Sequence, residues 1–152
     1  MSQSTNLLVF IIEDTRLAVD LDQVDRVVRA ATLKPIPGAP AFVMGLLNLN
    51  GVPIPVLSLR SKLNFEEREL DTTDEIIIIK RHQALLGLVV DEVESVSQVK
   101  NIPPIASAAQ LSHLRGALKL NDEIVLVHDI DAFLSDKEEL DLATALARSA
   151  VE

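Results

Sequence analysis

Apolar residues along this chain fall in short runs that are separated by polar pairs and proline clusters. Leu7 to Ile12 is a continuous apolar run, Glu13-Asp14-Thr15 is a cluster of turn residues, and Arg16 to Leu21 forms the next segment. Short runs bounded by turn residues are typical of buried β-strands. The chain is therefore predicted to open with a strand, a hairpin turn and a second strand.

A second hairpin is predicted further along. Ala41 to Leu49 is apolar, Asn50-Gly51 is the strongest two-residue signal for a type I′ turn, and Val52 to Leu59 returns as a strand. Pro53 and Pro55 fall on alternate positions of that strand and cannot donate ladder hydrogen bonds. The returning strand is therefore expected at a sheet edge or beside a bulge.

The two halves of the chain repeat each other. Leu17 to Val28 lines up with Leu86 to Ser97 at a constant offset of 69. At an offset of 71, the positions Gly45, Leu47, Leu49, Asn50, Ile54 and Val56 reappear as Gly116, Leu118, Leu120, Asn121, Val125 and Val127. The repeat predicts a mostly β protein of two similar small barrels packed together, with the polar stretch 64–75 as the junction of the halves. Such an architecture presents surfaces and favours a scaffold or adaptor over an enzyme.

The C-terminal segment differs from the rest. Ser135 to Glu138 reads as a capping box, and the Glu-, Leu- and Ala-rich residues to Val151 favour helix. Leu142 and Leu146 lie one turn apart, and a neighbouring stripe carries Ala143, Ala147 and Ala150. We expect a helix over 135–152 that lies on the barrels, with its stripe used for packing or, less commonly, for a partner.

Composition narrows the class of partner. The 152 residues are 48% hydrophobic but only 3% aromatic, and 14 basic against 23 acidic side chains give a net charge of −9. This charge repels phosphate backbones and anionic lipid, so nucleic acid is not expected as a partner. The N-terminus lacks a basic region, and runs such as Ile76 to Ile79 are too short to span a bilayer. With no cysteine, the chain fits a reducing cytoplasm, and neither export nor membrane insertion is expected.

Residues that could carry chemistry are scattered. His82, His113 and His128 stand in separate contexts with no nucleophile elbow nearby. The glycines do not form a phosphate-binding loop, and in a strand His128 and Asp129 would point to opposite sides. Paired carboxylates such as Asp91-Glu92 recur with the repeat, as turn residues do. No catalytic residue, metal site or cofactor is predicted.

Several apolar residues in otherwise polar segments have two interpretations. Val24 and Val27, and their repeat counterparts Val93 and Val96, either fill the core or line a groove for an apolar helix. The sequence leaves both interpretations open.

Motifs in both halves resemble the CheW family of chemotaxis coupling proteins over about residues 7 to 134. The resemblance rests on the order of several segments: Phe10, Leu17-Ala18-Val19-Asp20, Val24, the loop 36–43, the stretch Gly45 to Arg60, and Leu86 to Val93. It implies one CheW-like domain of two SH3-like five-stranded β-barrels around a shared apolar centre. It also implies a non-catalytic adaptor that links methyl-accepting chemoreceptor tips to the regulatory domain of a CheA-type histidine kinase, working in the cytoplasm at membrane receptor arrays.

The resemblance further implies where the receptor binds. It places receptor contacts around Val24, Arg26, Val27, Asn50 and Gly51, whereas Gly45 and Gly51 are assigned to backbone geometry. The family signature Asn-Leu-Arg-Gly reads Asn48-Leu49-Asn50-Gly51 here, and Arg26 stands where the family commonly has glutamate.

These two charge changes have two interpretations. They mark either a better type I′ turn at Asn50-Gly51 or an altered partner. In the latter case the chain is a coupler or accessory protein of a pilus-motility or surface-sensing pathway. From a different class, a groove between the barrels could bind a small apolar or purine-like ligand, although the chain has few aromatic side chains to line it.

Overall fold

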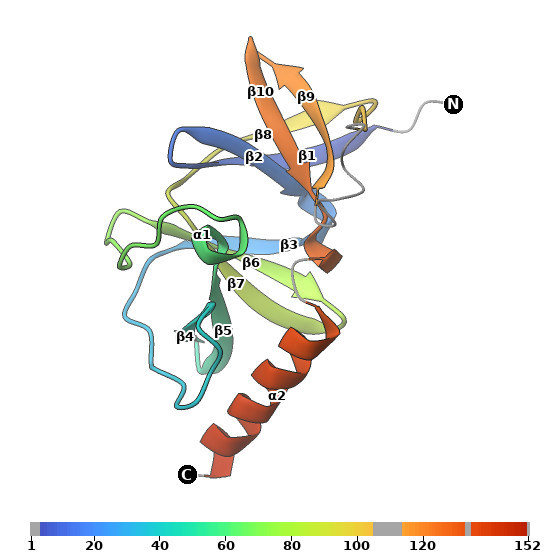
Figure 1. Ribbon diagram of the computed structural model, residues 1–152. Coiled ribbons are helices and arrows are strands. Elements are labelled where there is room, and N and C mark those ends of the chain that lie inside the picture. Colours follow the sequence, from blue (N-terminus) through green and yellow to red (C-terminus); the bar gives the residue numbers. More distant parts are fainter. Residues whose placement is uncertain (1–3, 105–113, 133–134, 152) are drawn as a thin grey trace.

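The computed structural model describes residues 4–104, 114–132 and 135–151, and these form two five-stranded sheets and a C-terminal helix (Figure 1). We call the sheets A and B. The elements in chain order are β1 (Thr5–Ile12), β2 (Thr15–Asp20), η1 (Leu21–Gln23), β3 (Val24–Arg29), β4 (Val43–Leu49), β5 (Val52–Ser58), α1 (Leu59–Lys62), β6 (Glu75–Arg81), β7 (Ala84–Val90), β8 (Glu92–Val99), β9 (Leu114–Leu120), β10 (Glu123–His128), η3 (Ile130–Ala132) and α2 (Asp136–Val151).

The two sheets have the same topology. Sheet A has the strand order β8-β1-β2-β10-β9 and sheet B the order β3-β6-β7-β5-β4. When β1–β5 are matched with β6–β10, as the sequence repeat requires, the two orders become identical. Each sheet also contains one parallel pair, β10 with β2 and β5 with β7. The predicted mostly β fold with two similar five-stranded units is confirmed, although no pairing joins the edge strands of either sheet in the described residues.

Neither sheet corresponds to one half of the sequence. Sheet A takes β1 and β2 from the first half and β8, β9 and β10 from the second, and sheet B takes the complementary set. The chain therefore crosses between the sheets at η1 and again at Asp91. The polar stretch 64–75 joins the sequence halves, yet the strands that precede and follow it, β5 and β6, both belong to sheet B.

The core explains why the apolar runs are continuous. In β1, Leu8, Phe10 and Ile12 face a core shared by both sheets, whereas Leu7 and Val9 face a second core within sheet A. Successive strand residues point to opposite faces, so a strand buried on both faces is apolar throughout. The shared core, called here the central core, contains the buried residues Leu8, Phe10, Ile12, Leu17, Val19, Phe42, Leu57, Leu59, Ile77, Ile79, Leu86, Leu88, Val90, Ile130 and Leu142.

Two repeat-related glycines allow a loop to lie against a strand. A Cβ on Gly45 would lie 2.8 Å from the carbonyl oxygen of Lys34, and a Cβ on Gly116 would lie closer still to that of Pro103. Both approaches are too close for a real side chain. At the first site, Lys34 and Leu46 exchange two backbone hydrogen bonds of 2.8 and 2.7 Å, so the loop covers the outer edge of β4.

The proline-containing strand is expected at a sheet edge or beside a bulge; β5 is an interior strand of sheet B, but a register shift lies next to Pro55. β5 lies between β7 and β4, and the register shift in its pairing with β4 falls between Val43 and Gly45, opposite Leu57 and Val56. Pro53 and Pro55 are tolerated because the pairing of β5 with β7 begins only at Val56. In sheet A the equivalent pairing begins two residues earlier, at Val125. In sheet B the two parallel strands are thus unpaired at positions where the equivalent strands of sheet A are paired.

The C-terminal helix α2 lies against sheet B (Figure 1). Leu142 and Ala145 are buried, and Leu146 packs partly against the central core. Ala143 and Ala147, which the sequence placed on a neighbouring stripe, are exposed, and the side chain of Ala150 lies outside the described residues. The predicted packing helix is therefore present, with a narrower buried face than its alanines suggested.

Candidate functional site

The β3 strand carries three of the residues that the sequence assigned to partner binding. It is one of the two edge strands of sheet B and pairs only with β6 among the described strands. Val24 and Val27 are half-buried and pack against the central core. The core interpretation therefore applies to both valines, whereas the groove for an apolar helix stays a prediction.

Arg26 lies on the same strand with 51% of its side chain exposed. Its Nε donates to Asp25 Oδ2 at 2.8 Å, an ion pair between neighbours in sequence. Exposed pairs of this kind contribute little to stability. The Arg26 guanidinium is therefore available to a partner at small energetic cost.

The repeat counterpart of β3 is β8, one of the two edge strands of sheet A. Val93 packs against the central core as Val24 does, but Val96 is 53% exposed. The two edge strands follow the two crossings of the chain between the sheets. They are thus equivalent in topology but differ in the apolar surface that they present.

Asn50 and Gly51 form the turn between β4 and β5. Both have positive φ, 51° and 89°, as a type I′ turn requires, and the Gly51 amide donates to Asn48 Oδ1 at 2.7 Å. The strand order places β3 and β4 at opposite edges of sheet B. Among the described contacts, no hydrogen bond or ion pair joins Arg26 to Asn50 or Gly51.

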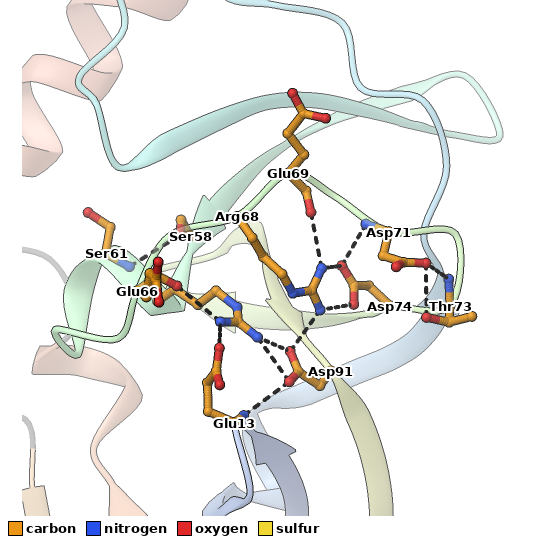
Figure 2. A network of polar contacts seen from close by, with 11 residues as sticks. Glu13, Ser58, Ser61, Glu66, Arg68, Glu69, Asp71, Thr73, Asp74 and Asp91 are labelled. Atoms are coloured by element: carbon orange, nitrogen blue, oxygen red, sulfur yellow. Dashed lines mark hydrogen bonds and ion pairs between the residues drawn. The ribbon is translucent and has the colours of Figure 1, made fainter.

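A cluster of charged residues at the second crossing was not anticipated from the sequence (Figure 2). Arg60, only 8% exposed, donates from Nη2 to both Asp91 carboxylate oxygens at 2.7 and 2.9 Å. It also pairs with Glu13 in the β1–β2 turn of sheet A and donates to the Glu66 carbonyl at 3.0 Å. Asp91 in turn accepts the Glu13 amide at 3.0 Å. The cluster therefore ties sheet A, sheet B and the segment 64–75 together.

Arg68 extends the same cluster along the segment 64–75. It donates to both oxygens of Asp74 at 2.6 and 2.9 Å and to Asp91 Oδ1 at 3.1 Å. Asp74 is 2% exposed and also accepts the Asp71 amide at 2.8 Å. A buried carboxylate with this many donors is fully compensated, which explains how a polar segment can be fixed against the protein.

The electrostatics of the cluster favour its charged forms. Burial on its own raises the pKa of Asp91, but the Glu13 amide and the Arg60 guanidinium outweigh burial and lower that pKa overall. Burial on its own lowers the pKa of Arg60, but hydrogen bonds to Glu13 and Asp91 raise it overall. Two features of the sequence could have indicated this cluster: the charged Arg60 directly after a buried apolar strand, and the acidic Asp91 where the chain crosses between the sheets.

The described residues assemble no candidate metal centre. Within 4–104, 114–132 and 135–151, no group of three or more histidines and carboxylates is placed to hold a metal ion. His82 lies in the β6–β7 turn, His128 is buried at the end of β10, and His113 lies outside the described residues. No helix in the described part of the chain is long and apolar enough to cross a membrane.

Comparisons with known proteins give a consistent result. A family model for the CheW-like domain matches residues 6–138. A chemotaxis protein CheW of Treponema pallidum is 27% identical over 146 residues, covering 90% of this chain and 86% of that protein. The Bacillus subtilis chemotaxis protein CheW is 28% identical and covers 87% of each chain. Protein FrzA of Myxococcus xanthus is 29% identical, covering 72% of this chain and 71% of its own.

The fold also matches a solved structure. The crystal structure of the scaffolding protein TtCheW from Thermoanaerobacter tengcongensis superposes with a TM-score of 0.77. The two chains share 23% identity, and the match covers 91% of this chain and 92% of that one. At this identity the likeness establishes the fold, which agrees with the two sheets described above.

Proposed function

The chain belongs to the CheW-like domain family, and we propose from this premise that it is a non-enzymatic adaptor that couples chemoreceptors to a CheA-type histidine kinase in chemotaxis. The observation that carries the proposal is the match of the family model to residues 6–138, which includes nearly the whole of both sheets. An adaptor of this kind transmits a signal by binding one state of its partners better than another. Its place of work would be the cytoplasm, at receptor arrays.

The receptor-binding surface is proposed on β3 and the β4–β5 turn. Supporting this, β3 is an edge strand with half-buried Val24 and Val27 and an exposed Arg26. Half-buried apolar residues beside an exposed charge suit a helical partner that buries an apolar stripe and pairs at its rim. Asn50 and Gly51 would contribute the second contact from the turn.

Calorimetric titration against two partners tests the function. The titrants are the regulatory domain of a CheA-type kinase and a helical hairpin from a receptor tip, both from the same cell. Binding of both partners is expected for a coupler. Binding of the kinase domain alone would indicate an accessory protein, and binding of neither would exclude the adaptor function.

Charge substitutions test the surface. Arg26→Glu and Asn50→Arg bring these positions to the charges that the family commonly carries, so each is expected to strengthen binding of a standard receptor tip and to change its salt dependence. Lys119→Glu is the matched control, because Lys119 is an exposed cation on β9 of the other sheet. Equal affinities for the parent chain and all three variants would contradict the proposed surface.

A further inference from the structure

The attachment of α2 to sheet B resembles that of a bound ligand helix. Two adjacent carboxylates near its start bind two cations of the protein body. Glu138 pairs with Lys62 Nζ at 2.5 and 2.6 Å, and Glu139 pairs with Arg81. Further along, Leu142 and Ala145 are buried and Leu146 is partly buried. An acidic first turn followed by apolar residues is the pattern with which an amphipathic helix occupies a groove.

The cations that receive α2 also contact the protein body. Lys62 Nζ lies 5.2 Å from the centre of the Phe42 ring, a cation–π contact. Arg81, 7% exposed, donates to the Asp131 carbonyl at 2.8 Å. These contacts hold both cations in place for an acidic helix start. In a chain of net charge −9, the two cations form a recognition element for adjacent carboxylates.

α2 does not fill all of the space between itself and sheet B. A cavity of about 590 Å³ lies between α2 and the segments of β5 and β7 that do not pair with each other. Its walls are mainly apolar and include Pro53, Pro55, Leu85 and Leu86 from sheet B with Leu142, Ala143 and Leu146 from α2. The polar side chains Arg81, Gln83 and Glu139 also line it. The cavity exists because β5 and β7 do not pair before Val56, whereas sheet A is paired at the equivalent positions. A side chain larger than that of Ala143 would have space there.

We propose that the surface of sheet B beneath α2 is a helix-binding groove. In this structure α2 occupies the groove, and a helix of a partner protein can replace it. The partner helix begins with two adjacent carboxylates and carries a leucine-sized side chain where α2 has Ala143. Charge complementarity with Lys62 and Arg81 selects its first turn, and the unfilled cavity selects its larger side chain. This inference goes beyond the proposed adaptor function and does not rest on it.

The competition between the two helices sets the expected affinity. A helix on the same chain has an effective concentration of about millimolar, so an equivalent free helix competes poorly with α2. Burying the extra carbons of leucine in place of alanine contributes roughly tenfold to a hundredfold in affinity. A free helix that fills the cavity should therefore displace α2 at about 10–100 μM.

The probe is a fluorescent peptide with the sequence of residues 135–151 and the substitution Ala143→Leu, titrated against the full chain. A spin label on a single cysteine introduced at Thr144, an exposed position of α2, reports displacement, because the chain has no other cysteine. The Ala143→Leu peptide is expected to bind about tenfold to a hundredfold more tightly than the unsubstituted one and to mobilise the label. Its charge-reversed form, with Glu138→Lys and Glu139→Lys, should lose at least about tenfold.

Two variants of the full chain provide a further test. Leu142→Ala weakens the packing of α2, and Glu138→Ala, at a partly exposed position, weakens its attachment if the first variant does not fold. Both should bind the peptide more tightly than the parent chain does. The proposal is overturned if no peptide binds these variants, if charge reversal leaves affinity unchanged, or if the label stays immobile on binding. A dimer formed by exchange of α2 would assign the groove to a second copy and likewise overturn it.

Discussion

Arg60 and Asp91 join the two sheets where the chain crosses from β7 to β8, with Arg60 Nη2 2.7 Å and 2.9 Å from the two carboxylate oxygens of Asp91. Arg60 is nearly inaccessible to water and also pairs with Glu13 of sheet A. Removing such a guanidinium leaves two carboxylates without their main partner, which costs more than the loss of an exposed pair. The ion cluster therefore stabilises the packing of the two sheets against each other.

Arg60→Gln is expected to lower the free energy of unfolding by about 2 kcal/mol, because it keeps part of the side-chain volume but leaves the partly buried Asp91 with Arg68 and the Glu13 amide as its remaining described donors. Urea denaturation measures the loss. Lys119→Gln serves as the control, since Lys119 pairs with Asp122 at an exposed site and should change stability by less than about 0.5 kcal/mol. Equal effects of the two substitutions would mean that the cluster has no structural role.

The lowered pKa values of Asp91 and Glu138 predict acid sensitivity. For Glu138, burial on its own raises the pKa, and the hydrogen bonds from Lys62 and the Ser135 amide lower it overall. A carboxyl with a lower pKa in the folded state stabilises the fold fully above its ordinary pKa. That contribution is lost as the pH falls through the lowered pKa.

The substitution Asp91→Asn isolates one of these contributions. The stability difference between the parent chain and this variant should be largest near pH 7 and should shrink as the pH falls below about 4. Urea denaturation at a series of pH values measures the difference. A difference that stays constant down to about pH 3 would show that Asp91 titrates alike in the folded and unfolded states.

The glycines at the loop contacts should differ from the glycine of the turn. Gly116→Ala and Gly45→Ala each place a Cβ against a backbone carbonyl oxygen, closer than real side chains approach, and are expected to cost at least about 2 kcal/mol. A Cβ added to Gly51 would meet no atom within 4 Å, and the only strain is a positive φ of 89°, so Gly51→Ala should cost about 1 kcal/mol. Thermal unfolding of the three variants ranks the costs, and a larger loss at Gly51 would contradict the close approach.

The β6–β7 turn offers a stabilising change. His82 and Gln83 adopt positive φ of 50° and 66°, which Asn and Gly adopt more readily than other residues. Replacing both by Asn-Gly is expected to raise stability by about 1 kcal/mol, because relief of the left-handed strain exceeds the entropy cost of the added glycine. The same replacement of Glu13-Asp14, whose φ values are also positive, should give no net gain, because it removes the Glu13 partner of Arg60. Thermal unfolding of both double variants tests the contrast.

Much of the local structure could be predicted from the sequence because its signals act over a few residues. The run 7–12, the Asn50-Gly51 turn and the helix after Ser135 each appear where the apolar pattern and turn residues placed them. The repeat also indicated two equivalent units, since matching positions such as Gly45 and Gly116 serve the same backbone contact. Steric limits on the backbone and the period of side chains in a strand fix these features without reference to distant residues.

The tertiary structure alone decided how the halves combine. The repeat shows that two units are alike, but it does not show that each sheet takes strands from both halves. It could not show either that β5 is an interior strand whose prolines precede its pairing with β7. Contacts between residues far apart in sequence, such as Glu13 with Asp91 or Arg81 with Glu139, form only after both sheets and α2 have assembled. The strands and turns were therefore determined locally, whereas the ion cluster and the groove under α2 arise from packing.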